Sequence, residues 1–187
     1  MRAGLAFLIL FITAVVAVSS CPTIITRDGW GARPATRRTN LRRPVPFVLI
    51  HHSAGNNCDN LSKCTSTVRN IQAYHMDSRR WSDIGYNFLI GGDGSVFEGR
   101  GWTRQGSHEP KYNANGLGIC FLGNFQGEAP TAAAIESAKR LIDCGVSTNM
   151  ISNNYKLIGH RQAKSTECPG NNLYNLIKKW KNWTPNP

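Results

Sequence analysis

Two histidines and a cysteine in this 187-residue chain have the residue types and positions of a metal site. His51 begins a His51-His52 pair that closes an apolar run, whereas His160 and Cys168 lie eight residues apart near the end of the chain. Neutral imidazole and thiolate are ligands that zinc favours, and three protein ligands leave a fourth position for water, as in catalytic zinc sites. We therefore expect His51, His160 and Cys168 to hold Zn²⁺ in an enzyme.

Apolar runs before both histidines predict the strands that carry them. The run Phe47–His51 ends in the first histidine, and Leu157-Ile158-Gly159 directly precedes His160, so Cys168 would follow on a loop. Stiff supports of this kind suit a preorganised metal site. A single histidine is more often structural or a surface residue than a ligand, but the combination with Cys168 favours the metal site.

The rest of the chain alternates short apolar runs with helical patterns, which is typical of an α/β domain. We expect a single domain with a central mixed β-sheet of about five strands and three main helices packed on it. The strands are expected at Phe47–His51, Tyr86–Ile90, Ser95–Glu98, Leu117–Leu122 and Lys156–Ile158. The helices are expected at Lys63–Asp77, at Thr131–Asp143 with an end at Gly145, and at Asn172–Trp180.

The first twenty residues combine a basic Arg2, a long apolar stretch and small residues before Cys21. This arrangement predicts a cleaved signal peptide at 1–20, a single domain at 21–187, and a secreted, extracellular protein. The alternative is a membrane anchor, which is disfavoured because no cluster of Lys or Arg follows at once. We therefore expect no stable membrane anchor.

The formal net charge is +11, and removal of the signal segment, with its one Arg and no acid, leaves +10. This charge attracts anionic partners but does not choose among extracellular polyanions, bacterial wall polymers and nucleic acid. The densest basic stretch, Arg37 to Arg43, lies between Pro34 and Pro44. It is better explained as a solvated surface loop than as a nucleic-acid arm, and no nucleic-acid motif accompanies it. We expect no nucleic-acid partner.

Six cysteines in the exported part favour disulfides, although an even number does not require that all pair. Cys58 and Cys64 enclose five residues, so a local bridge would join the loop after the histidine pair to the next helix. A bridge between Cys21 and Cys144 would tie down the mature N-terminus. Cys120, inside an apolar run, is interpreted as a free buried residue.

Several blocks of sequence resemble a known family. They are Leu49-Ile50-His51-His52-Ser53-Ala54-Gly55, Trp81-Ser82-Asp83-Ile84-Gly85-Tyr86-Asn87-Phe88, Glu98-Gly99-Arg100-Gly101-Trp102, Gly159-His160-Arg161 and Glu167-Cys168-Pro169-Gly170. In this order, from about Cys21 to Trp183, they are similar to the short secreted peptidoglycan recognition proteins and, more distantly, to phage amidases.

The resemblance implies a zinc-dependent N-acetylmuramoyl-L-alanine amidase acting on bacterial peptidoglycan and muropeptides in antibacterial innate immunity. Members that are amidases keep the first histidine of the pair, the later histidine and the cysteine, which are His51, His160 and Cys168 here. Members that only bind wall fragments lose one or more of them. The alternative is therefore a non-catalytic receptor or bacteriostatic binder, which needs the cleft but not the metal.

The resemblance also assigns the remaining site residues. Tyr86 and Thr166 correspond to the family's catalytic positions, where a neutral hydroxyl can donate to a developing oxyanion. The peptide-binding cleft maps onto His52, His75, Arg79, Arg80, Trp81, Arg100, His108 and Asn113. In the family, Gly-Trp before the serine goes with diaminopimelate in the stem and Asn-Phe with lysine. Arg80-Trp81 matches half of the first pattern, so we expect a modest preference for diaminopimelate.

Overall fold

The structure is a computed structural model that describes residues 21–187, so the expected signal segment 1–20 lies outside the described residues. Six strands form one mixed sheet in the order β1-β4-β3-β5-β2-β6. Their bounds are β1 Ile24–Ile25, β2 Val45–His52, β3 Phe88–Ile90, β4 Val96–Glu98, β5 Gly116–Phe121 and β6 Ile151–Gly159. Among these six strands of residues 21–187, β3 and β4 form the one antiparallel pair, as expected for a hairpin. The predicted α/β class is confirmed.

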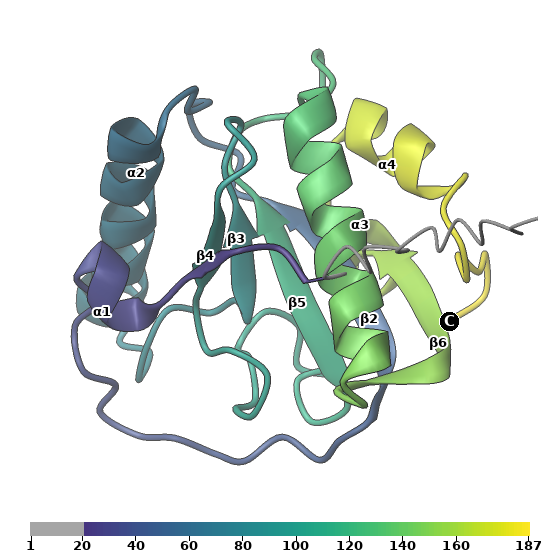
Figure 1. The fold of residues 1–187 in the computed structure, drawn as a ribbon, viewed down its shortest axis with the longest axis horizontal. Helices are drawn as coiled ribbons and strands as arrows, with labels where there is room; N and C mark the ends of the chain where they lie inside the picture. Colours follow the sequence, from purple (N-terminus) through teal and green to yellow (C-terminus); the bar gives the residue numbers. More distant parts are fainter. Residues whose placement is uncertain (1–20) are drawn as a thin grey trace, which may run out of the picture.

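Helices cover both faces of this sheet (Figure 1). The helices are α1 Arg27–Trp30, α2 Leu61–Ala73, α3 Ala132–Ser147 and α4 Asn171–Ile177. A π-helical turn at Tyr74–Ser78 continues α2, and a 3₁₀ turn at His160–Gln162 follows β6. Within residues 21–187, no helix is long and apolar enough to cross a membrane.

The two faces of β2 have different partners because successive side chains of a strand point to opposite sides. Val48 and Ile50 belong to the core cluster that includes residues of α3 and α4. Leu49 instead packs with Tyr112 and Ile158 on the other face. His51 follows the alternation of Leu49, so the sheet directs His51 away from α3 and α4.

Several elements differ from the sequence prediction. The expected strand Tyr86–Ile90 begins at Phe88, and the expected helix Asn172–Trp180 ends at Ile177. The two-residue strand β1 was not expected, because a pair of isoleucines carries no periodicity; it makes the sheet one strand larger. Strand β6 begins at Ile151, and its polar first half has no apolar run to predict it. The expected helix end at Gly145 is wrong, because α3 continues to Ser147. A Cβ at Gly145 would lie 2.5 Å from Ile151 and 2.8 Å from Trp102, so this glycine serves close packing.

Candidate metal centre

The register of β2 and β6 brings the two histidines together. These strands are parallel neighbours with Ile50 opposite Gly159, so His51 and His160 are the next residues along each strand. Their ring centroids lie 4.4 Å apart. His51 is 1% exposed, and the His160 side chain is 16% exposed. A buried imidazole pair therefore stands at the carboxyl end of the two strands.

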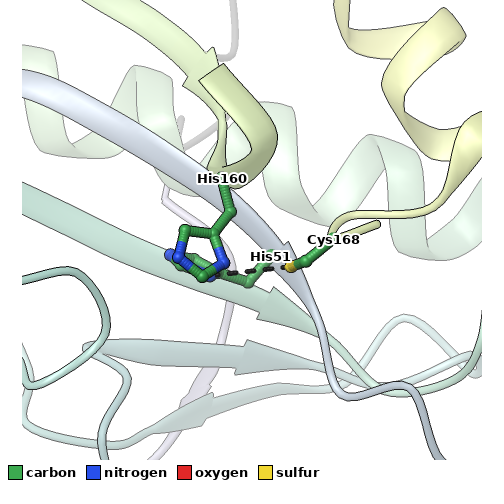
Figure 2. Close-up of side chains that lie close together, drawn as sticks. All are labelled: His51, His160 and Cys168. Carbon is green, nitrogen blue, oxygen red and sulfur yellow. Dashed lines mark hydrogen bonds between the residues drawn. The ribbon is translucent and has the colours of Figure 1, made fainter. Parts of the chain in front are cut away.

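Cys168 reaches this pair from the loop that precedes α4, and Figure 2 shows the three side chains pointing toward one another. The Cys168 Sγ atom lies 3.8 Å from His51 Nδ1. It also accepts a hydrogen bond of 3.3 Å from the backbone N–H of His52. Three segments that are far apart in the sequence thus meet at one point.

The donor set fits a zinc ion. One ligand atom from each of His51, His160 and Cys168 lies within 4.8 Å of the others. Tetrahedral zinc, with Zn–N near 2.0 Å and Zn–S near 2.3 Å, sets neighbouring ligand atoms about 3.3 to 3.6 Å apart. The distance of 3.8 Å between His51 Nδ1 and Cys168 Sγ is close to this spacing. Two nitrogens and one sulfur leave one position of a tetrahedron open.

Burial prepares the two histidines for metal binding but opposes ionisation of the cysteine. It lowers the pKa of His51 well below its usual value and also lowers the pKa of His160, so both rings are neutral at pH 7. Burial raises the pKa of the Cys168 thiol to about 12. A cation that binds here must therefore displace the thiol proton.

Tyr86 lies next to the candidate ligand His51, with its ring centroid 5.3 Å from that of His51. Burial raises the pKa of its phenol well above 10, and the phenol forms a hydrogen bond with the Cys120 thiol. Tyr86 is therefore a neutral donor at physiological pH. Thr166 is exposed on the cysteine loop, where its Oγ1 accepts the backbone N–H of Cys168 at 3.3 Å.

A polar and aromatic wall continues from Tyr86. The His75 ring lies 5.7 Å from the Tyr86 ring and stacks on Trp81 at 4.6 Å. The Arg79 guanidinium lies 5.6 Å from the Trp81 ring. The Nδ1 atom of His75 accepts the backbone N–H of Gly85 at 3.0 Å, which fixes the ring. The structure thus brings His75, Arg79 and Trp81 together next to Tyr86 and the candidate metal ligand His51.

Two further arginines of the expected cleft have different settings. Arg100 donates to the backbone carbonyls of Ile84 at 2.7 Å and Gln105 at 2.8 Å, so its guanidinium joins the Gly99-Gly101 turn to neighbouring loops. Arg80 is exposed and has a φ of 57°, in the left-handed region that favours glycine. This backbone conformation explains why glycine suits this position in the Gly-Trp pair of the family motif.

The other three expected cleft residues lie against the protein interior. His52 points to the opposite face of β2 from His51, and its Nδ1 accepts the backbone N–H of Phe125 at 3.3 Å. His108 is 9% exposed, and its Nδ1 lies 3.1 Å from His51 Nε2. Asn113 Oδ1 accepts the backbone N–H of His108 at 2.9 Å. The structure therefore places His108 directly behind a metal-ligand candidate.

Sequence reasoning missed Glu109. Its Oε2 lies 3.1 Å from His160 Nε2, and its side chain is 7% exposed. Nothing in the local pattern singled it out, because it lies in a loop without periodicity, 51 residues before His160. The one available signal was a lone glutamate directly after a histidine that the family resemblance had already marked.

Four of the five cysteines outside the candidate centre form the two expected disulfides. Cys21 is joined to Cys144 and Cys58 to Cys64. Cys120 is free and fully buried, while Cys168 is free and partly buried. The Cys58–Cys64 bridge joins the loop after β2 to α2. The cysteine at the metal centre is therefore a thiol that can serve as a ligand.

The fold and the centre define an α/β domain with two histidines and a cysteine at the carboxyl ends of its strands. A family model described as N-acetylmuramoyl-L-alanine amidase matches residues 41–171, which include all three of these residues. The chain belongs to this amidase family.

Its relatives are peptidoglycan-recognition proteins. Peptidoglycan-recognition protein SC2 of Drosophila melanogaster is 51% identical over 161 residues, which cover 86% of this chain and 88% of that protein. The structure of bumblebee PGRP-SA matches with a TM-score of 0.88 and 44% identity, covering 89% of this chain and all of that one. Peptidoglycan recognition protein LE, solved with tracheal cytotoxin, a monomeric diaminopimelic acid-type peptidoglycan, matches with a TM-score of 0.86 and 40% identity over 87% of this chain and 96% of that one.

Proposed function

We propose that this protein is a secreted zinc amidase that binds bacterial peptidoglycan and hydrolyses the bond between N-acetylmuramic acid and L-alanine of the stem peptide. The observation that carries the proposal is the convergence of His51, His160 and Cys168, with ligand atoms within 4.8 Å of one another. A protein that only binds wall fragments has no need of this donor set.

The residues around the centre supply what amide hydrolysis requires. Bound zinc polarises an amide carbonyl and lowers the pKa of water to about 7. Tyr86 is a neutral phenol beside His51 and can donate a hydrogen bond to the oxyanion that develops on the attacked carbonyl. Thr166, on the loop of Cys168, is the second hydroxyl proposed to serve this anion.

The wall formed by His75, Arg79 and Trp81 suits a peptide with carboxylates. The exposed guanidinium of Arg79 can hold a carboxylate, and the face of Trp81 can cover aliphatic parts of a stem residue. The match to a relative solved with a diaminopimelic acid-type muropeptide supports muropeptides as ligands. We propose that Arg80 and Trp81 favour diaminopimelate over lysine at the third stem position.

Two disulfides support an oxidising, extracellular compartment for this activity. The identity to peptidoglycan-recognition proteins supports a role in antibacterial innate immunity. A net charge of +11 also suits an anionic bacterial wall.

Mass spectrometry of muropeptides tests the proposal. The purified mature chain is incubated with peptidoglycan after treatment with a chelator, and then again after zinc is restored. Free stem peptides that begin with L-alanine should appear only with zinc. A chain that sediments with peptidoglycan but releases no stem peptide in the presence of bound zinc would be a binder, and the amidase assignment would fail.

A further inference from the structure

Each of the two histidine candidates makes a hydrogen bond through its Nε2 atom, and the two partners are adjacent in the sequence. His51 Nε2 lies 3.1 Å from His108 Nδ1. His160 Nε2 lies 3.1 Å from Glu109 Oε2. A single loop corner, His108-Glu109, thus contacts both histidines from behind.

This corner is itself held in place. Asn113 Oδ1 accepts the backbone N–H groups of His108 and Glu109, at 2.9 and 3.0 Å. The second carboxylate oxygen of Glu109 accepts the backbone N–H of Lys111 at 3.3 Å. A Cβ at Gly118 would lie 2.4 Å from His108 Cδ2, so the His108 ring occupies space that is open because residue 118 is glycine. The carboxylate of Glu109 therefore has little freedom to turn away from His160.

The pairing decides which nitrogen of His160 is free for a metal. A neutral imidazole has one N–H and one lone pair, and the N–H is fixed by the acceptor that it meets. A carboxylate is an acceptor, so Glu109 selects the tautomer with the proton on Nε2. The lone pair then lies on Nδ1.

We infer that Glu109 is a positioning residue that fixes the tautomer and ring orientation of His160, so that its Nδ1 is presented to a metal shared with His51 and Cys168. The inference rests on the proposed function only in taking zinc as the metal. Carboxylates behind metal-binding histidines raise ligand basicity as well as orienting the ring, and their loss typically weakens metal binding about 10- to 100-fold. Glu109 touches none of the reacting atoms.

Zinc affinity of the full mature chain tests the inference, measured by competition with a chromophoric chelator. Glu109→Ala should weaken zinc binding about 10- to 100-fold. Glu109→Gln keeps an acceptor oxygen at the same place and should lose less affinity than Glu109→Ala. The matched control is Glu167→Ala, which removes an exposed charge one residue from Cys168 and should change affinity by no more than about fivefold.

Nitrogen NMR of the metal-free histidine rings gives a second readout that a general loss of stability would not mimic. In the unmodified chain His160 should carry its proton on Nε2, and in folded Glu109→Ala it should populate both tautomers. Equal zinc affinity of Glu109→Ala and the unmodified chain would overturn the inference, as would an equal loss in Glu167→Ala. A chain that binds no zinc at all would instead overturn the proposed function.

Discussion

The two halves of the metal centre are built differently. His51 lies near the end of β2 and His160 directly follows β6, and the Nε2 atom of each ring is hydrogen-bonded to the loop corner 108–109. Cys168 stands on a loop whose preceding residues 164–167 are exposed, and its thiol accepts the backbone N–H of His52 and lies 3.8 Å from His51 Nδ1. The histidine half is thus preorganised, whereas the cysteine half must lose a proton.

Replacing Cys168, the candidate ligand that lies on a loop, should have the largest effect on hydrolysis. In Cys168→Ser the thiolate is lost, and we expect hydrolysis of peptidoglycan to fall below detection because zinc is no longer held by three protein ligands. Binding to insoluble peptidoglycan should persist, because the wall of His75 and Trp81 does not contact this thiol. Sedimentation and muropeptide release measure the two properties separately. Undiminished hydrolysis by this variant would mean that Cys168 is not a zinc ligand.

Tyr86→Phe should have the next largest effect, with a loss of about 10² to 10³ in kcat, because loss of one oxyanion donor typically costs this much. Zinc affinity should change little, because the substitution removes a neutral hydroxyl whose hydrogen bond is to Cys120 and keeps the ring beside His51. Steady-state kinetics on a soluble muropeptide, together with a chelator titration, would show both. A loss of zinc affinity that matches the loss of rate would mean that Tyr86 acts through the ligands instead.

The contrast between the halves also predicts a pH dependence of zinc binding. The lowered pKa values of His51 and His160 mean that neither ring releases a proton near pH 7, whereas Cys168, with a pKa of about 12, must release one. Apparent zinc affinity should therefore rise about tenfold per pH unit from pH 7 to pH 9. Chelator competition across this range checks the slope. A zinc affinity that does not change with pH would mean that the thiol is already ionised. A hundredfold rise per pH unit would mean that a histidine must release a proton as well.

The smallest effect concerns the stem peptide. Arg80→Gly should narrow the preference for diaminopimelate over lysine by no more than about fivefold, because an exposed charge pair contributes about 0 to 1 kcal/mol. Arg80→Ala is the control for the left-handed backbone at this position, since it removes the charge but keeps a Cβ. The ratio of kcat/KM on matched fragments is the measurement. An unchanged ratio of kcat/KM in both variants would mean that Trp81 or Arg79, and not Arg80, determines the preference for diaminopimelate.

The sequence predicted the parts of the site that regular elements carry. Apolar runs before His51 and His160 indicated strands, and strand ends in a parallel pair meet at the same edge of the sheet. The loop partners could not be predicted in this way, because Glu109 and His160 have no common period and meet only through the packing of a loop. Alternation along β2 predicts that His52 points to the opposite face from His51, where its Nδ1 accepts the backbone N–H of Phe125. The assignment of His52 to the cleft came from the family resemblance and stays a prediction.

Packing likewise decided the elements that local patterns misjudged. Gly145 has the residue type of a helix end, yet α3 continues past it because Trp102 and Ile151 fill the space beside it. Strand β1 is only two residues long and is defined by its pairing with β4. Such features depend on contacts between distant segments, which a single sequence does not display.

Stepwise addition of zinc to the metal-free chain, with the initial rate of stem-peptide release measured at each step, tests whether one zinc ion held by His51, His160 and Cys168 is needed for hydrolysis. We expect the rate to rise in proportion to zinc, to reach a plateau at one zinc per chain, and to stay at the baseline in Cys168→Ser. A rate that is independent of zinc, or bound zinc that brings no release of stem peptide, would contradict this expectation.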